Sequence, residues 1–322
     1  MRFEVLGRDK QGPVRLGIEM DNPFDAPGRW LRGSFHCHVA QLGDAEAVCE
    51  HYQRLGFQFL GSSDYNQITA MPASTADFVT FQGAEIFDPR QIDLLHVICT
   101  GLTDLPRPLN GQLDDVRRLV GQIETDRGLA ILAHPFWSDY SWSELTELAK
   151  SGIAGFEVSN RLCQQINGKG RADQIWQLLL NAGHEHLAAI GADDANAWDK
   201  ELIGQTWTAV LASECTPEGI LEAVRQNRTY ASEGPHIQAV RVDPSGYLEV
   251  ETSPCLACHF MSRGFGVRSV WADRPTKQFR INLAEDGYRL RQWLSVCIED
   301  DAGRRAWSSA IPVKVEMMAR DG

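Results

Sequence analysis

Short apolar runs alternate with segments of helical periodicity between about residue 33 and residue 213. Seven of these runs have the length and composition of buried strands, and an eighth follows them. Strands and helices that alternate along a chain form parallel βα units. The pattern therefore predicts an α/β fold, a closed or distorted (β/α)7 TIM-like barrel whose chemistry lies at the C-terminal strand ends. An open, doubly wound sheet is the alternative. The strand candidates are GSFHCH, FQFLGSSD, FVTFQGAEI, LLHVICTG, LAILAHP, GFEVSN, LAAIGADD and TWTAVLAS.

The pattern changes after a last helix, which Thr216 caps and which ends near Gln226. Beyond it, short alternating stretches such as IQAVRV and FRINLA are separated by Pro, Gly and Asp turns, with little helical period. Such stretches predict a small antiparallel β domain. The expected domains are a barrel over residues 1–228, with 1–30 as an N-terminal extension, and a β-sandwich-like domain over residues 229–322.

The charge of the chain bears on its partners. Among 322 residues, 43 are acidic and 31 are basic, which gives a net charge of −12. A surface of that sign repels phosphate backbones and anionic lipid, so we expect no nucleic-acid partner and no membrane partner. The sequence begins without the apolar core of a secretory signal, and no run of about eighteen apolar residues occurs in it. We therefore expect a cytoplasmic protein.

Eight cysteines are scattered along the chain, several of them in apolar strand-like runs, and this usage is typical of reduced core residues. One local pattern competes with that interpretation. Cys255, Cys258 and His259 spell C-x-x-C-H, the attachment signature of a c-type haem. A zinc knuckle would need a second ligand pair, and none follows. Two small buried residues in a β-rich segment, beside a partly buried histidine, are the preferred interpretation.

Histidines and carboxylates gather at, or just beyond, the ends of the predicted strands. His36 and His38 lie two apart on a strand, so both imidazoles project from one face and can bind one ion. Each such residue alone is as readily explained as a helix cap, a satisfied core histidine or a solvated carboxylate. Together they would be costly to bury at one barrel mouth without the compensation that a metal cluster supplies. The residues concerned are His36, His38, Asp64, Glu85, His96, His134, Glu157, Asp193 and Asp194.

These ordered motifs resemble the polymerase-and-histidinol-phosphatase (PHP) superfamily of metal-dependent hydrolases, and within it the branch of carbamate and ester hydrolases with an appended β domain. The resemblance covers nearly the whole chain from residue 29 onward and implies a distorted (β/α)7 barrel with up to three metals at its mouth. The matching segments are GRWLRGSFHCHV, GFQFLGSSDYN, GAEI, the isolated His96, AHP, FEVSN, IGADDAN, EGILEAVRQNRTYASEGP and GRRAWSSAIPV.

The resemblance implies ligands for two divalent transition-metal ions. His36, His38, Glu85 and Asp194 match the ligands of one ion, and Glu85, His96 and His134 match those of a second. Imidazole and carboxylate ligands suit Zn²⁺, Fe²⁺ or Mn²⁺. The third site departs from the family pattern, because Tyr65 and Asn196 stand where family members usually carry histidines. Both losses fall on one site, so two ions are expected to remain.

The side chains expected to serve catalysis are Tyr65, Asp64 and Asp193. Tyr65 is interpreted either as a proton donor to a leaving oxygen or as a filler of the vacated space. Asp64 and Asp193, together with Glu157, are expected to orient the ligating imidazoles.

Four side chains are candidates for contact with substrate. An arginine beside two cations is useful when something anionic binds, although Arg161 could equally begin a surface loop. The placement of Tyr230 near the mouth rests on the resemblance alone. The candidates are Asn160, Arg161, Asn196 and Tyr230.

Hydrolysis is the expected reaction, because two ions that share a carboxylate activate water and stabilise a charged transition state. A small-molecule phosphoester is the favoured substrate, since phosphoryl transfer is the commonest chemistry of the superfamily. The β domain of the matching branch points instead to carboxylic esters or carbamates. A third interpretation is a non-catalytic binding protein with a degenerate site, because two expected imidazoles are missing. Metal content distinguishes this last interpretation from the other two.

Overall fold

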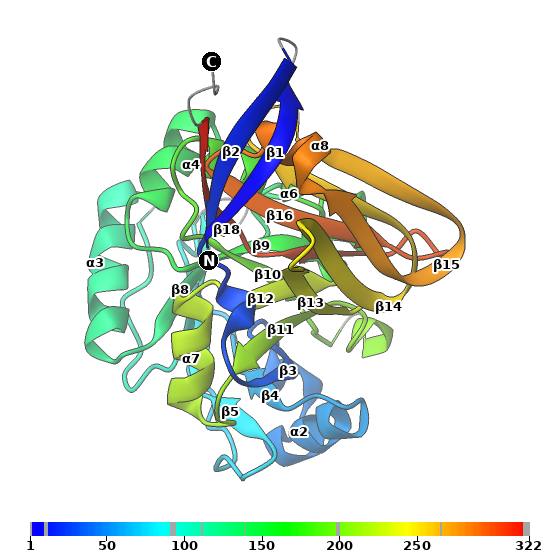
Figure 1. The fold of residues 1–322 in the computed structure, drawn as a ribbon. Coiled ribbons are helices and arrows are strands. Elements are labelled where there is room, and N and C mark those ends of the chain that lie inside the picture. The colour runs from blue at the N-terminus through cyan, green and yellow to red at the C-terminus, as the bar shows by residue number, and fades with distance from the viewer. Residues whose placement is uncertain are drawn as a thin grey trace. The chain divides into compact units, whose positions relative to one another are not determined.

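The computed structural model describes residues 2–9, 12–90, 95–110, 112–138, 140–197, 200–264 and 266–317. The chain divides into two compact units (Figure 1). The α/β unit is Pro27–Glu233, and the β unit combines Met1–Ala26 with Gly234–Gly322. This division differs from the expected one, in which the first thirty residues extend the barrel.

The difference has its origin in strand pairing across the ends of the chain. In the β unit, β2 (Gly12–Met20) pairs antiparallel with β18 (Ile311–Met317), with Val313 opposite Met20. β1 (Arg2–Asp9) pairs in turn with β2. The N-terminal segment is thus a hairpin of the β unit.

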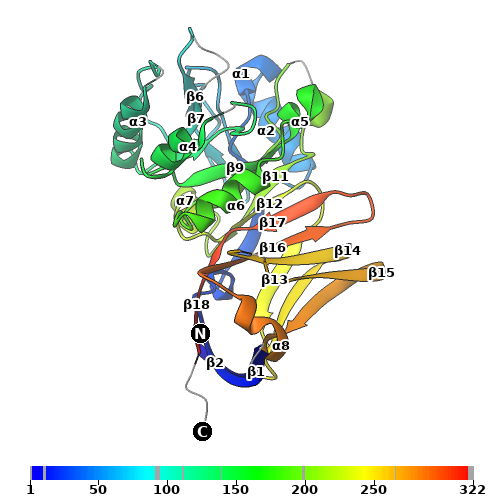
Figure 2. The same ribbon diagram turned by 90° about the horizontal axis from the view of Figure 1, so that it is seen from above.

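The rest of the β unit is antiparallel, as the sequence predicts. β14 is a strand of 16 residues that pairs with β13, β15 and β16, and β16 pairs with β17 and β18. Figure 2 shows the long β14 and β15 side by side. By its pairing this unit is one continuous sheet. The remaining elements are η1 (Pro23–Asp25), β13 (Ile237–Val242), β14 (Tyr247–Ser262), β15 (Arg268–Asn282), α8 (Leu283–Asp286), η3 (Gly287–Arg289), β16 (Trp293–Glu299) and β17 (Arg305–Ser308).

The C-x-x-C-H segment lies within β14. Cys255 and Cys258 are both fully buried, and the register of β14 against β15 is irregular between Cys255 and Ala257. Nδ1 of His259 lies 2.8 Å from Oγ of Ser269 on β15. The structure therefore places these cysteines in the core of the sheet as free thiols.

The α/β unit contains two sheets. The first has the order β12-β11-β3-β4-β5, in which β3, β4 and β5 are parallel and β11 is antiparallel to both β3 and β12. The second has the order β10-β9-β8-β7-β6, in which β7 runs antiparallel to β6 and β8. The strands are β3 (Arg29–Ser34), β4 (Phe59–Gly61), β5 (Val79–Phe81), β6 (Gly83–Phe87), β7 (His96–Thr100), β8 (Leu129–Leu132), β9 (Gly155–Asn160), β10 (Ala188–Ala192), β11 (Trp207–Ala212) and β12 (Thr229–Ser232).

The arrangement is mixed α/β, as the sequence predicts, but the described strands do not form a closed barrel. Within the described residues, the ladders form two separate sheets. Two isolated parallel bridges join them. Cys37 pairs with Ala195 beyond the ends of β3 and β10, and Tyr65, which follows β4, pairs with Glu85 within β6. The two sheets therefore approach each other where the sequence places its histidines and carboxylates.

An apolar core holds the two sheets together. Branched and aromatic side chains from both fill it, and residues of α7 close one end. Burying each such side chain stabilises the fold by about 1.5–3 kcal/mol. Its members include Leu31, Phe35, Phe59, Phe81, Ile98, Ile131, Ile190, Val210, Ile220 and Leu221.

Helices follow most strands of the α/β unit, and side chains at the helix N-termini cap several of them. Ser141 and Glu144 form a capping box at the start of α4, and Thr216 caps α7 as the sequence predicts. None of the described helices has the length and apolarity that crossing a bilayer requires. The helices are α1 (Val39–Leu42), α2 (Ala45–Arg54), α3 (Leu113–Thr125), α4 (Trp142–Ala149), α5 (Arg161–Asn167), α6 (Asp173–Asn181), η2 (Lys200–Leu202) and α7 (Pro217–Arg225).

Candidate metal centre

Strand ends from both sheets of the α/β unit bring six predicted ligands together. His36 and His38 follow β3, and Asp194 follows β10. His96 opens β7, and because β7 is antiparallel to β6 and β8, its first residue lies where those strands end. All six side chains are buried, and none is more than 6% exposed: His36, His38, Glu85, His96, His134 and Asp194.

The first group of ligand atoms surrounds Oδ1 of Asp194. This oxygen lies 3.0 Å from Nε2 of His36 and 3.1 Å from Nε2 of His38. Oε2 of Glu85 lies 3.4 Å from each of the same two nitrogens. Four potential ligand atoms from three strands thus converge.

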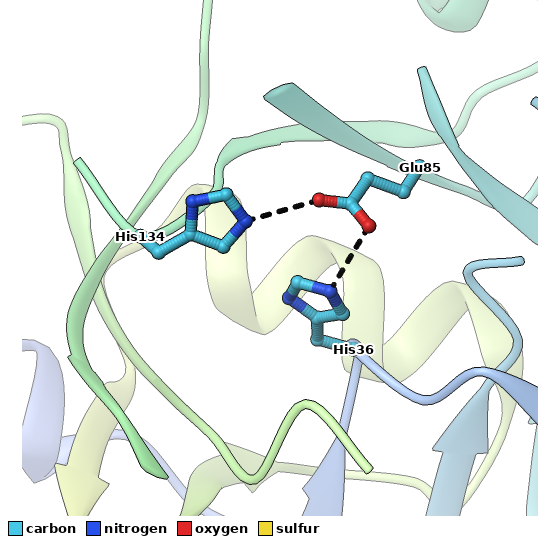
Figure 3. Close-up of side chains that lie close together, drawn as sticks. All are labelled: His36, Glu85 and His134. Atoms are coloured by element: carbon cyan, nitrogen blue, oxygen red, sulfur yellow. Dashed lines mark hydrogen bonds and ion pairs between the residues drawn. The ribbon is translucent and has the colours of Figure 1, made fainter. Parts of the chain in front are cut away.

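The second group surrounds the other oxygen of Glu85. Its Oε1 lies 2.6 Å from Nδ1 of His96 and 3.1 Å from Nε2 of His134. Figure 3 shows His134 and His36 directed at the two oxygens of this one carboxylate. The carboxylate of Glu85 therefore faces both groups of imidazoles.

The separations in the first group, 3.0–3.4 Å, fit a metal ion. Zinc binds imidazole nitrogen and carboxylate oxygen at about 2.0–2.2 Å, which places neighbouring ligand atoms of a tetrahedron about 3.4 Å apart. Nε2 of His36 and Oε2 of Glu85 are buried and make no hydrogen bond in the structure. Buried polar atoms are costly without a partner, and one cation between these two would satisfy both. Buried His, Asp and Glu groups of this kind indicate divalent-metal binding.

The imidazoles and carboxylates of the cluster also shift one another's pKa values. Burial alone would lower the pKa of His36, but the carboxylates of Asp194, Glu157 and Glu85 raise it well above its ordinary value. Burial alone would raise the pKa of Glu85, but His96 and His36 hold it well below its usual range. The carboxylate of Glu85 is therefore ionised at neutral pH and offers negative charge to a cation.

A further layer of hydrogen bonds surrounds the ligands. Glu157, on β9, lies 2.7 Å from Nδ1 of His36 through its Oε1 and accepts the backbone N–H of His134 at 2.7 Å through its Oε2. The side-chain amide of Asn160 donates to Oε2 of Glu157 at 3.0 Å and to Oδ2 of Asp194 at 3.1 Å. His134 and Asp194 both have positive φ, at 28° and 53°. Non-glycine residues rarely adopt this conformation, and it is common at functional sites.

The two residues that replace expected histidines lie beside the first group. The ring of Tyr65 packs 4.2 Å from that of His38, and burial followed by the charges of Glu85 and Asp194 raises the pKa of its phenol. Asn196 is fully buried, and its amide donates to the backbone carbonyl of Asp194 at 3.4 Å.

Asp64 lies beside the cluster and holds its backbone. Both of its oxygens accept the N–H of Ala40, and Oδ2 also accepts the hydroxyl of Thr69 at 2.5 Å. Ala40 lies two residues after His38, at the start of α1. Asp64 therefore anchors the backbone of the segment that carries a candidate ligand.

Asp193 likewise accepts hydrogen bonds from groups outside the cluster. Its carboxylate accepts the hydroxyl of Ser34 at 2.9 Å, the phenol of Tyr52 at 2.7 Å and the N–H of Gly204 at 2.8 Å. Burial raises the pKa of Asp193 to about 6, against these hydrogen bonds. Asp193 thus fastens the end of β3 to the end of β10.

Arg161 and Tyr230 have partners outside the cluster. The guanidinium of Arg161 donates to Oε1 of Gln205 at 3.0 Å and of Gln165 at 3.3 Å. The ring of Tyr230 is buried edge-on against Trp30, with centroids 4.8 Å apart. On β12, Tyr230 lies opposite Ala209, two residues before the strand end. Their substrate contacts remain predictions.

Sequence reasoning missed two residues that shape the site. Phe87 stacks on His96, with centroids 4.5 Å apart and planes at 17°. Tyr52 reaches Asp193 from α2. Phe87 is the last residue of β6, two residues after Glu85, and this position could have indicated a place beside the site. No local pattern distinguishes Tyr52 from an ordinary core residue.

Comparisons with known proteins give structural neighbours only. No family model matches the sequence, and no curated protein matches it. One similar solved structure is a two-domain protein containing a predicted PHP-like metal-dependent phosphoesterase from Bacteroides vulgatus, with 18% identity, a TM-score of 0.49 and 99% of each chain covered. Another is Endonuclease Q in complex with a duplex substrate with an abasic lesion, with 13% identity, a TM-score of 0.41, and 61% of this chain and 57% of that chain covered.

The likeness to both structures is distant, so it carries no argument about the reaction. The description of the first neighbour names the PHP family, which is also the family that the sequence motifs resemble. The absence of a nucleic-acid partner stays a prediction.

Proposed function

We propose that the protein is a metal-dependent hydrolase of the PHP kind, acting as a phosphoesterase. The observation that carries the proposal is the carboxylate of Glu85, whose two oxygens face two groups of buried imidazoles. A shared carboxylate between imidazoles is the ligand arrangement of a two-metal hydrolytic site. We also propose that the α/β unit is a distorted barrel whose ring is interrupted between its two sheets.

The chain's own residues account for two ions. His36, His38, Asp194 and Glu85 would hold the first, and Glu85, His96 and His134 would hold the second. The donor set suits Zn²⁺, Fe²⁺ or Mn²⁺. When bound, such ions lower the pKa of a bound water and stabilise the charge of a phosphoryl transition state. The third site of the family is lost, because neither Tyr65 nor Asn196 offers an imidazole.

Tyr65 lies beside the first group and carries a hydroxyl that can donate to the leaving group. Its ring is fixed between His38 and Phe87, whose centroid lies 5.5 Å away. Its neutral phenol can donate a proton or a hydrogen bond to an oxygen that leaves. Phe87 and Tyr65 also give one wall of the site an apolar surface that excludes water.

The charge distribution supports a small phosphoester over a polymer. Residues 27–233 carry 27 of the 43 acidic residues and 15 of the 31 basic ones, so the net charge of −12 belongs to the α/β unit. That field repels an extended polyanion. The two ions themselves would supply local positive charge for one phosphate group.

Metal analysis and two substrates test the proposal. Purified protein, reconstituted with Zn²⁺ or Mn²⁺, is expected to hold two ions per chain and to hydrolyse a nitrophenyl phosphate. His36→Ala is expected to lose the activity, and His51→Ala, an exposed histidine on α2, serves as the matched control. Faster hydrolysis of a nitrophenyl ester would move the assignment to the ester and carbamate class. Absence of bound metal after reconstitution would support a binding protein instead.

A further inference from the structure

We propose that Glu157 and Asn160 form a positioning pair that orients two ligands of the first metal group and one of the second, and so ties the two groups together. The inference rests on the proposed metal centre and deepens it. It also revises the expected role of Asn160, which the sequence predicts as a substrate contact.

Glu157 fixes the ring of His36. The carboxylate is 1% exposed, and its Oε1 lies 2.7 Å from Nδ1 of His36. A carboxylate accepts hydrogen bonds, so this contact places a proton on Nδ1. Nε2, which faces Asp194 and Glu85, is then the nitrogen that carries the lone pair for a metal.

The same carboxylate fixes the backbone at a ligand of the second group. Oε2 of Glu157 accepts the N–H of His134 at 2.7 Å, and His134 has the unusual φ of 28°. A strained backbone persists only where its surroundings hold it. Glu157 therefore sets the position of His134 through the main chain while it sets that of His36 through the side chain.

Asn160 completes the connection to the third strand end. Its side chain is fully buried, and its two amide hydrogens are donated to Oε2 of Glu157 and Oδ2 of Asp194. Its Oδ1 accepts the N–H of Cys163 and so caps α5. The amide has no hydrogen left for a substrate. Because Oδ2 of Asp194 is held in this way, Oδ1 is the oxygen directed at the two imidazoles.

The contacts give the pair a specific consequence. Three ligands, which follow β3, β8 and β10, are held by one buried carboxylate and one buried amide. Both of these side chains belong to β9. Loss of either member should loosen metal binding without unfolding the sheet. Outer hydrogen-bond partners of metal ligands are typically worth about 10–100-fold in metal affinity.

Two conservative variants test the pair. Glu157→Gln keeps the shape but loses one acceptor oxygen, and Asn160→Ser keeps a capping oxygen for α5 but loses both amide donors. Zn²⁺ affinity, measured by competition with a chromophoric chelator, is expected to fall about 10–100-fold in each. Glu233→Gln is the matched control. The Glu233 carboxylate accepts a hydrogen bond from the hydroxyl of Ser159, which is also on β9, and forms an ion pair with Arg171 outside the cluster. Its Zn²⁺ affinity should equal that of the wild type.

A second readout separates this inference from the proposed function. In metal-free protein, the Nδ1 proton of His36 is expected as a strongly hydrogen-bonded, slowly exchanging NMR resonance that disappears in Glu157→Gln. If the wild type binds no metal, the proposed function fails, and this resonance still decides whether Glu157 orients His36. The inference is overturned if both variants bind Zn²⁺ as tightly as the wild type, or if the resonance persists in Glu157→Gln.

Discussion

The carboxylate of Glu85 faces His134 with one oxygen and His36 with the other, at 3.1 and 3.4 Å from the two Nε2 atoms (Figure 3). Two histidines from different sheets thus share one acid. Glu85 lies in β6 and forms, with Tyr65, one of the two isolated bridges that join the sheets. The residue that faces both ligand groups is therefore also one of the residues through which the two sheets pair.

Removing the charge of Glu85 is expected to abolish both metal positions. Glu85→Gln leaves both groups of imidazoles without their shared anion, whereas His38→Ala removes one ligand from the first group alone. Metal content by elemental analysis should fall close to zero in Glu85→Gln and keep the second ion in His38→Ala. Glu50→Gln, an exposed change on α2, is the control. Equal metal loss in Glu85→Gln and His38→Ala would contradict separate groups.

Metal removal is expected to destabilise the α/β unit. A ligand present at about 100 times its dissociation constant stabilises the folded state by about 2.7 kcal/mol. At about 2–4 °C per kcal/mol for a unit of this size, chelation should lower the melting temperature by about 5–10 °C. Differential scanning calorimetry with and without a chelator, followed by addition of Zn²⁺ or Mn²⁺, measures the change. A melting temperature that chelation leaves unchanged would argue against tightly bound metal.

Much of the site could be predicted because strand ends concentrate chemistry in α/β folds. His36, His38, Glu85 and Asp194 each follow or lie within an apolar run, so their convergence needed only the strand assignments. The direction of β7 could also have been inferred. Only residues 88–95 separate β6 from β7, and a parallel crossover needs a dozen residues or more.

Other features depend on contacts that no local pattern records. The pairing of β2 with β18 joins segments almost the whole chain apart, so residues 1–26 could not be assigned to the β unit from their own periodicity. The role of Asn160 was similarly hidden. An asparagine before a helix indicates a cap, and the structure adds that its two amide hydrogens are donated to Glu157 and Asp194.

Tyr65 offers a direct test of leaving-group assistance. Tyr65→Phe keeps the ring against His38 and Phe87 and removes only the hydroxyl. If the phenol donates to the leaving oxygen, kcat should fall about 10²-fold or more, with metal content unchanged. Substrates with leaving groups of different acidity sharpen the measurement, since a good leaving group needs little help. An unchanged kcat for the poorest leaving group would show that Tyr65 only fills the vacated third site.

The buried Tyr52–Asp193 contact is expected to stabilise the fold apart from any role in catalysis. The phenol of Tyr52 donates to Oδ2 of Asp193 at 2.7 Å, and Gly204 donates to the same oxygen. Tyr52→Phe removes one donor from a fully buried carboxylate, which costs about 1–3 kcal/mol. Urea unfolding should show this loss, while Tyr247→Phe, in the β unit under Arg280, should change stability by no more than about 0.5 kcal/mol. Because Asp193 holds Ser34 and Gly204 as well, metal affinity should stay near that of the wild type, and a large loss of affinity would place Asp193 among the groups that orient the ligands.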